Sequence, residues 1–309
     1  QNTVQEISDT SAELISQAQE LTSLNKQLNS SDNTEDVSSV DTVQDTQEEG
    51  TLSPSHSSDS SSDESMNSLL SQIDPLLPQN NGIWSVYVCN LMKNTEGEIN
   101  AQPMQAASLI KLFIMGAVYE NYESLADAYG ADTLNSYLNP MITVSDNDAA
   151  NKLVNMLGNG DDAAGMSAVN AFCTSHGYSS TSMGRLLLQS NEYGDNYTSV
   201  SDCGHFLKEI YQSNAGTVES TLAHTDAMYS LLKMQERRNK IPANLPEDVK
   251  VANKTGELDD VENDAGIIYS TAKNIDLVVC FMSQDLTDPG EAQAVIAQDS
   301  RLIYGYYNE

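Results

Sequence analysis

The amino-acid sequence predicts an α/β (α+β) fold, in which helices flank one five-stranded antiparallel sheet and an all-helical subdomain is inserted between its second and third strands. Segments rich in aromatic and β-branched residues, typical of strands, occur near residues 82–104 and again after residue 249. The segments between them have the apolar spacing of helices. Because the strand-forming segments are grouped at the two ends of the globular part, we expect them to share one sheet.

The expected elements follow a simple order from residue 66 onwards. A helix over 66–77 precedes two strands, and a very apolar helix begins at Ser108. The strands are expected at 82–92, 97–104, 249–256, 264–270 and 275–283, and the further helices at 132–144, 148–157, 165–177, 199–212 and 289–307. We therefore place the sheet part at about 66–105 and 249–309, and the helical part at about 106–248.

The first 64 residues differ in composition from the rest. Residues 29–64 are rich in Ser, Asp, Thr and Glu and nearly free of large apolar side chains. Such a segment cannot offset the entropy cost of ordering, so we predict a disordered acidic linker. In residues 1–28, apolar residues recur every seven positions from Ile7 to Leu28, which fits a short amphipathic helix or a short coiled coil. Residues 65–309 form the predicted globular domain.

The chain is strongly acidic, with a formal charge of −31 from 14 Lys and Arg against 45 Asp and Glu. Nucleic acid and anionic membrane surfaces are therefore poor partners, because phosphate groups need a basic face. No apolar run approaches the roughly 20 residues of a transmembrane helix. The chain starts at Gln1, so we expect a leader that was removed or that is not part of this sequence. The expected location is outside the cell, either secreted or tethered to the cell surface through the linker. No cofactor or metal is expected, because the cysteines and histidines lack metal-ligand spacing.

Three short motifs carry the chemistry of the predicted domain. A serine three residues before a lysine occurs at Ser23/Lys26, Ser108/Lys111, Ser230/Lys233 and Ser270/Lys273. The tripeptide SDN occurs at 31–33 and 145–147, and KTG occurs once, at 254–256. Only one set of copies places all three motifs in the globular part in a sensible order. In this set Ser108 opens a helix, SDN at 145–147 connects two helices, and KTG at 254–256 ends a strand. Without the other two motifs, Ser108 and Lys111 would equally fit a helix cap and a lysine that extends from an apolar face.

This combination of motifs resembles the penicillin-recognising serine enzymes, and class A β-lactamases most closely. The resemblance covers most of residues 66–309 and includes the stretches PMQAASLIKLFIMGAVYE, LNPMITVSDNDAANKLVNMLG and VANKTGEL. It implies the two-part fold of that family, which agrees with the order of elements above. Residues 1–65 lie outside it.

The resemblance implies roles for four residues of the first two motifs. Ser108, at a helix N-terminus, would be the nucleophile, and Lys111, one turn further on the same face, would be its general base. A lysine in a dry site near a second cation, here Lys254, loses proton affinity and can accept the proton. Ser145 would relay a proton to the leaving nitrogen, and Asn147 would hold Lys111 and the substrate amide.

The third motif would bind the substrate. Lys254 and Thr255 would bind its carboxylate, and Gly256 would let it approach the strand edge closely. The oxyanion hole would consist of the backbone N–H groups of Ser108 and Glu257, directed at the developing charge.

One element of class A β-lactamases is missing. Those enzymes release the acyl group with a glutamate that follows an arginine on a loop between the helices and acts through a bound water. Here Arg185 is followed by leucines at 186–188. Glu192 and Asp195 are the nearest carboxylates, and we name Glu192 as the candidate deacylation acid. The alternative for both is an ordinary surface role in a very acidic protein.

Two further expectations follow from the family frame. The last three strands contain no arginine that could help to bind a substrate carboxylate. Cys89 and Cys280 would lie on neighbouring strands, and Cys173 and Cys203 would bracket the divergent loop, so each pair is a hypothesis for a disulfide. The alternative, four free buried thiols, is left open by the sequence.

The sequence therefore predicts a serine acyl-enzyme hydrolase that acts on β-lactams, on D-alanyl-D-alanine stem peptides of peptidoglycan, or on both. Acylation is expected, whereas deacylation is expected to be slow without the loop glutamate. The alternative is a non-catalytic or penicillin-binding cell-wall ligand module that retains the fold. The sequence leaves the choice between β-lactam and peptide, and the oligomeric state, open.

Overall fold

A computed structural model describes residues 64–309 of the chain. The helix expected in residues 1–28 and the linker expected up to residue 63 lie outside the described residues. The residue at which we ended the linker, Glu64, is the first residue of helix α2 (Glu64–Ile73), which is followed by the short 3-10 helix η1 (Asp74–Leu76).

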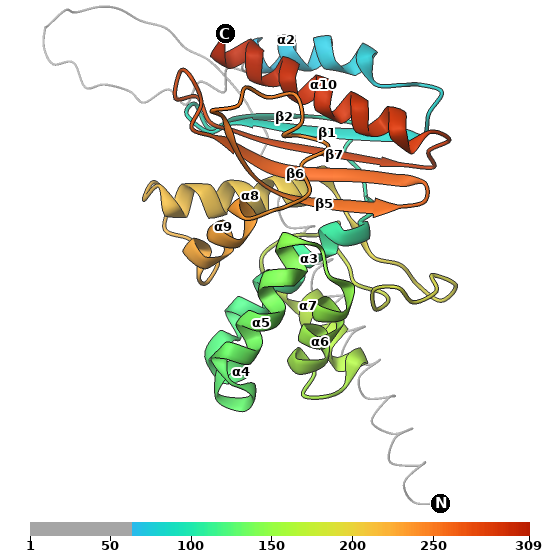
Figure 1. Ribbon diagram of the computed structural model, residues 1–309, viewed down its shortest axis with the longest axis vertical. Coiled ribbons are helices and arrows are strands. Elements are labelled where there is room, and N and C mark those ends of the chain that lie inside the picture. Colours follow the sequence, from blue (N-terminus) through green and yellow to red (C-terminus); the bar gives the residue numbers. More distant parts are fainter. Residues whose placement is uncertain (1–63) are drawn as a thin grey trace, which may run out of the picture. The chain divides into compact units, whose positions relative to one another are not determined.

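One five-stranded antiparallel sheet forms the centre of the domain, in the order β2-β1-β7-β6-β5 (Figure 1). Its strands are β1 (Ile83–Asn90), β2 (Thr95–Ile99), β5 (Lys250–Leu258), β6 (Val261–Tyr269) and β7 (Leu277–Gln284). The first strand of the domain pairs with the last, so the two ends of the chain share one sheet. The predicted fold class is confirmed.

Alternate residues of the central strands face two different hydrophobic cores. On β1, Val86 and Val88 belong to the core under α2 and α10 (Pro289–Asn308), whereas Tyr87 and Cys89 belong to the core under α8 (Val200–Asn214). Helices therefore cover both faces of the sheet (Figure 1). A strand that is buried on both faces needs apolar side chains at successive positions, and β1 and β7 have them.

The helical part lies between β2 and β5 in the chain. Its elements are η2 (Ala107–Leu109), α3 (Ile110–Glu120), α4 (Tyr122–Tyr129), α5 (Ala131–Thr143), α6 (Asn147–Leu157), α7 (Asp162–Ser175), α8 and α9 (Thr225–Lys233). We did not predict α4 or α9, which have only eight and nine residues. We also did not predict the short ribbon of β3 (Met104–Gln105) and β4 (Tyr197–Thr198), whose pairing depends on contacts distant in sequence.

Within residues 64–309, no helix is both long and apolar enough to span a membrane.

The four cysteines are free and buried, so neither hypothetical disulfide is present. Cys89 and Cys280 do lie on neighbouring strands, as expected. The register nevertheless places Cys89 opposite Val278 and Cys280 opposite Tyr87, so the two thiols are diagonal neighbours and not a facing pair. Burial raises the pKa of Cys89 to about 11 and that of Cys203 to about 12, which keeps both thiols protonated at neutral pH.

Candidate active site

The first motif lies where the chain leaves the sheet and enters the helical part. Ser108 is in η2, and Lys111 is in the first turn of α3, where every residue from Ile110 to Tyr119 is buried. Asn263 on β6 donates from Nδ2 to the carbonyls of Gln105 (2.9 Å) and Ala106 (3.2 Å), which ties the segment before Ser108 to the sheet. The nucleophile candidate is therefore positioned by the sheet as well as by its own helix.

Lys111 connects the first two motifs. Its Nζ lies 3.1 Å from Ser108 Oγ, 2.7 Å from Asn147 Oδ1, and 2.6 Å and 3.1 Å from the backbone oxygen and Oγ of Ser145. Ser145 adopts φ +63°, the left-handed region that a serine seldom occupies, and so turns both of its oxygens toward this amine. Asn147 begins α6, whose N-terminus is capped by Asp146.

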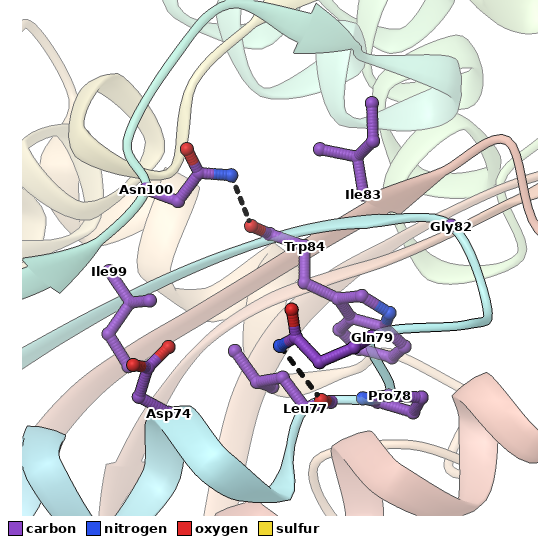
Figure 2. A pocket seen from close by; sticks show the side chains of 9 residues that line it. All are labelled: Asp74, Leu77, Pro78, Gln79, Gly82, Ile83, Trp84, Ile99 and Asn100. Carbon is purple, nitrogen blue, oxygen red and sulfur yellow. Dashed lines mark hydrogen bonds between the residues drawn. The ribbon is translucent and has the colours of Figure 1, made fainter.

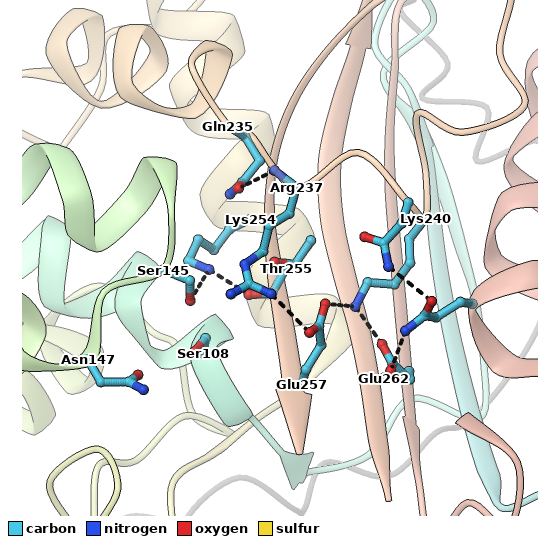
Figure 3. Close-up of polar contacts among 12 residues, drawn as sticks. Ser108, Ser145, Asn147, Gln235, Arg237, Lys240, Lys254, Thr255, Glu257 and Glu262 are labelled. Carbon is cyan, nitrogen blue, oxygen red and sulfur yellow. Dashed lines mark hydrogen bonds and ion pairs between the residues drawn. The ribbon is translucent and has the colours of Figure 1, made fainter. Parts of the chain in front are cut away.

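Lys254 on β5 reaches the same serine from the sheet side (Figure 3). Its Nζ lies 2.9 Å from Ser145 Oγ and 2.6 Å from the carbonyl oxygen of Thr255. The Oγ of Ser145 thus contacts the amines of both Lys111 and Lys254. Residues 109 positions apart in the sequence meet here, as expected from the order of the motifs and the family resemblance.

Gly256 permits the close approach of β5 to the start of the helical part. A Cβ atom at this position would lie 2.9 Å from the carbonyl oxygen of Ala106 and 3.2 Å from the backbone nitrogens of Ser108 and Leu109. A side chain would therefore push the strand away from Ser108. Thr255, one residue earlier, lines the pocket in front of Ser108 together with Glu257.

Burial changes the protonation of both lysines. Lys111 and Lys254 have no exposed surface. Burial, aided by the charge of Arg237 and opposed by Asp146, lowers the pKa of Lys111 to about 7. Burial and the nearby charge of Lys111 lower the pKa of Lys254 well below its ordinary value. Burial thus favours the free amine of Lys111, which is the form able to accept a proton.

A match to a family model identifies the protein family of this chain. The model of the β-lactamase enzyme family matches residues 68–125 and 127–307. The chain belongs to this family. No curated protein matches the chain at a significant level.

Several solved structures share the fold at low sequence identity. PBP-A is 23% identical, with a TM-score of 0.66 over 78% of this chain and 96% of PBP-A. An ancestral Gram-negative class A β-lactamase is 21% identical, with a TM-score of 0.64 over 77% of this chain and 99% of its own. A β-lactamase from Sphaerobacter thermophilus is 21% identical, with a TM-score of 0.62 over 78% of this chain and 98% of its own.

The pocket of this β-lactamase-family domain has a cation that the sequence analysis missed. Its volume is about 120 Å³, and its lining residues are Ser108, Ser145, Asn147, Arg237, Thr255 and Glu257. We noted that the last strands lack an arginine, which is correct. Arg237, however, lies in the irregular segment between α9 and β5 and reaches the same pocket. Arg237 precedes the KTG strand in the sequence, which is the only hint of its place. An irregular segment has no periodicity from which the direction of a side chain could be predicted.

The loop after Arg185 places a leucine beside the nucleophile candidate. A second hollow of about 230 Å³ is lined by Ser108, Asn147, Arg185, Leu187, Leu188 and Glu257, among others. Leu187 is 6% exposed, whereas Leu188 is 76% exposed and has φ +68°. Of the three leucines that follow Arg185, Leu187 and Leu188 thus line the space next to Ser108.

The two candidate deacylation acids have different surroundings. Asp195 accepts hydrogen bonds from Arg185 Nε (2.7 Å) and Gln105 Nε2 (3.0 Å), which closes the base of the loop. Burial raises the pKa of Asp195, but these hydrogen bonds outweigh it and hold the pKa below its ordinary value. Glu192 is exposed on the loop and is not among the residues that line either hollow beside Ser108. Its role in deacylation stays a prediction.

Another pocket, of about 290 Å³, lies between η1 and strands β1 and β2 (Figure 2). Its amide side chains are engaged with the backbone, since Asn100 Nδ2 donates to the carbonyl of Trp84 (2.8 Å) and Gln79 Nε2 to that of Leu77 (3.3 Å). None of the motif residues lines it. The chemistry predicted from the sequence therefore belongs to the pocket at Ser108.

Proposed function

We propose that this domain is a serine hydrolase that forms an acyl-enzyme at Ser108 with β-lactams, with D-alanyl-D-alanine peptides, or with both, and that releases the acyl group slowly. The contact between Lys111 Nζ and Ser108 Oγ, at 3.1 Å in a buried site, carries this proposal. A free amine within hydrogen-bond reach of a hydroxyl is what activation of a serine requires.

Acylation would use the three motifs together. Lys111, as the free amine, takes the proton of Ser108 while Oγ bonds to the carbonyl carbon of the substrate. The oxyanion would be met by the backbone N–H groups of Ser108 and Glu257. The C–N bond then breaks, and the leaving nitrogen receives a proton through Ser145, whose Oγ contacts both Lys111 and Lys254.

Substrate binding would use the strand edge and the opposite wall of the pocket. Asn147 would hold the substrate amide, and Lys254, Thr255 and Arg237 would lie near its carboxylate. Gly256 keeps the strand close enough to Ser108 for these contacts.

Slow deacylation is proposed because Leu187 lies beside Ser108. Hydrolysis of the acyl-enzyme needs a water and a group that removes its proton. The solved structure of a leucine-to-glutamate mutant of PBP-A is described as an acyl-enzyme complex with penicillin G, at 23% identity to this chain. That mutant therefore forms such an adduct on the same fold.

Intact-mass measurement over time after mixing with penicillin G tests the proposal. We expect a stable adduct of one penicillin G per chain that is absent in Ser108→Ala. Fast hydrolysis without a trapped adduct would contradict slow release. Neither adduct nor hydrolysis, with penicillin G and with a D-alanyl-D-alanine peptide, would favour the non-catalytic binding module.

Glu192→Gln tests the candidate deacylation acid, with Glu247→Gln as an exposed control distant from the loop in sequence. If Glu192 removes the proton from water, its variant should lose the adduct more slowly than the wild type, while the control should not. Equal rates in all three proteins would exclude Glu192 from deacylation.

We further propose that the domain works outside the cell, tethered by residues 29–64, where peptidoglycan is accessible. The acidic composition and the family's substrates support this location. Protease digestion of intact cells that carry the full chain would remove the domain if the proposal is right, and leave it intact if the domain is internal.

A further inference from the structure

Four charged side chains of alternating sign lie in a row beside the pocket (Figure 3). Arg237 Nη1 lies 3.1 Å from Glu257 Oε2, and Lys240 Nζ lies 2.9 Å from Glu257 Oε1. Lys240 Nζ also lies 2.6 Å from Glu262 Oε2. The side chain of Glu257 is therefore shared between an arginine that lines the pocket and a lysine that is fully buried.

Glu257 remains a carboxylate in this position. Burial raises the pKa of Glu257, but the charges of Lys240 and Arg237 outweigh it and hold the pKa below its ordinary value. The side chain is 31% exposed, so its charge is felt in the pocket and partly screened by water. It lies on β5 two residues after Thr255, and both line the same pocket as Ser108.

The position of Glu257 affects any ligand that brings its own carboxylate to this wall. Such a ligand would have to compete with Glu257 for Arg237 and would also meet the charge of Glu257 itself. Like charges placed together at a binding site cost affinity and so discriminate between ligands. An uncharged ligand group would leave the Arg237–Glu257 pair intact.

We propose that Glu257 is a specificity-determining residue, which disfavours a carboxylate on the ligand and favours an uncharged ester or amide at the position that faces Arg237. The inference rests on the proposed function only in taking the pocket at Ser108 as the ligand site. The inference predicts that substrates whose leaving group ends in an amide or ester bind to this pocket more tightly than the corresponding acids.

Equilibrium binding to the Ser108→Ala protein tests this without requiring acylation. The probes are penicillin G and its methyl ester, which differ by the charge of one group. Titration calorimetry would compare Ser108→Ala with Ser108→Ala/Glu257→Gln. Gln keeps the size of the side chain and can still accept a hydrogen bond from Lys240, which retains Glu262. Thermal unfolding would check that both proteins are folded.

A matched control separates this contact from a general change of charge. Glu236→Gln, in the same Ser108→Ala background, removes an exposed acid next to Arg237, and the backbone N–H of residue 236 remains bonded to Thr143 (2.9 Å). We expect Glu257→Gln to tighten binding of penicillin G about tenfold relative to its methyl ester, and Glu236→Gln to change that ratio by less than about twofold.

Two results would overturn the inference. One is an unchanged ratio of the two affinities in Glu257→Gln, including the case in which no protein binds either probe. The other is weaker binding of penicillin G by Glu257→Gln, which would mean that Glu257 positions Arg237 for the ligand instead of competing with it. Adding Arg237→Gln should abolish the gain. Adduct formation by the wild-type chain is measured separately, so failure of the proposed function is distinguishable from failure of this inference.

Discussion

The side-chain amide of Asn151 holds the backbone of Leu187 with two hydrogen bonds. Its Nδ2 donates to the carbonyl of Leu187 (3.0 Å), and its Oδ1 accepts from the N–H of the same residue (2.9 Å). A residue on α6 thus fixes the part of the loop that lies beside Ser108. The backbone of residue 187 is therefore held in place, and the side chain that it presents to the hollow lined by Ser108 is apolar.

Leu187→Glu should therefore accelerate loss of the adduct. A carboxylate on this fixed backbone would lie in the hollow beside Ser108, where it can remove a proton from water. We expect the rate constant for adduct loss to rise by about 10²-fold, the lower end of what a positioned general base contributes. Mass spectrometry after removal of free penicillin G would measure it.

Tyr193→Glu is the matched control for that variant. Tyr193 lies on the same loop, but its side chain is 91% exposed and lines neither hollow beside Ser108. The variant adds the same charge without placing it against Ser108, so the rate of adduct loss should remain within about twofold of the wild type. Equal acceleration by both variants would show that a charge anywhere in the loop is sufficient. The fixed position of residue 187 would then not be required.

Acylation should depend on pH through Lys111. Burial lowers its pKa to about 7, and only the free amine can accept the proton of Ser108. The acylation rate constant should therefore fall about tenfold per pH unit below pH 7 and level off above it. Stopped-flow measurement with penicillin G between pH 5.5 and 8.5 would show the profile. A profile that is flat in this range, or that rises only above pH 9, would contradict the assignment of Lys111 as base.

Lys111→Arg separates proton transfer from charge. The guanidinium keeps a cation in the site but does not deprotonate in this range. The acylation rate should drop by about 10²- to 10⁴-fold, and the step near pH 7 should disappear. A variant that retains the step would show that another group titrates.

The sequence was sufficient for the parts of the site that local patterns define. Ser108 and Lys111 are one helical turn apart, and the SDN and KTG motifs each form a compact unit, so their order in the chain and the family resemblance predicted a shared site. The lost glutamate was also visible, because it is defined by its distance from Arg185. The sheet was predictable because strand-forming segments are grouped at both ends of the domain.

Arg237 and the side chain of Glu257 were not predictable in this way. Arg237 lies outside regular structure, and its place depends on contacts with β5 that no local pattern reveals. Glu257 was assigned through its backbone N–H alone. Its carboxylate is held in place by an ion pair with Lys240, a buried lysine whose partners lie on β5 and β6. Such charge pairing depends on tertiary structure.

Gly256→Ala should impair acylation by moving the strand away from Ser108. The added Cβ would lie 2.9 Å from the backbone oxygen of Ala106, which a small shift of β5 or η2 must relieve. A displacement of about 1 Å at a reacting centre costs about 10²-fold, and we expect a loss of that order in the acylation rate. Gly290→Ala, on α10, is the control, and thermal unfolding would check that both variants are folded. Wild-type acylation by Gly256→Ala would show that the close approach is unimportant.

The stability of the fold should depend on pH through Asp299 on α10. This side chain is 1% exposed, and its Oδ2 has no hydrogen-bond partner within residues 64–309. Burial raises its pKa from 3.8 to about 7. Between these two values the folded state binds more protons than the unfolded state, so the contribution of Asp299 to stability is present below pH 4 and is lost as the pH rises to 7. Asp299→Asn should remove this loss. The free energy of unfolding of the variant should therefore rise relative to that of the wild type by up to about 1.4 kcal/mol per pH unit between pH 4 and 7.

Urea unfolding at several pH values would measure the difference, with the exposed Asp248→Asn as control. A constant difference between Asp299→Asn and the wild type across this range would mean that Asp299 does not titrate there, and the buried carboxyl would then have to be stabilised by a partner such as water.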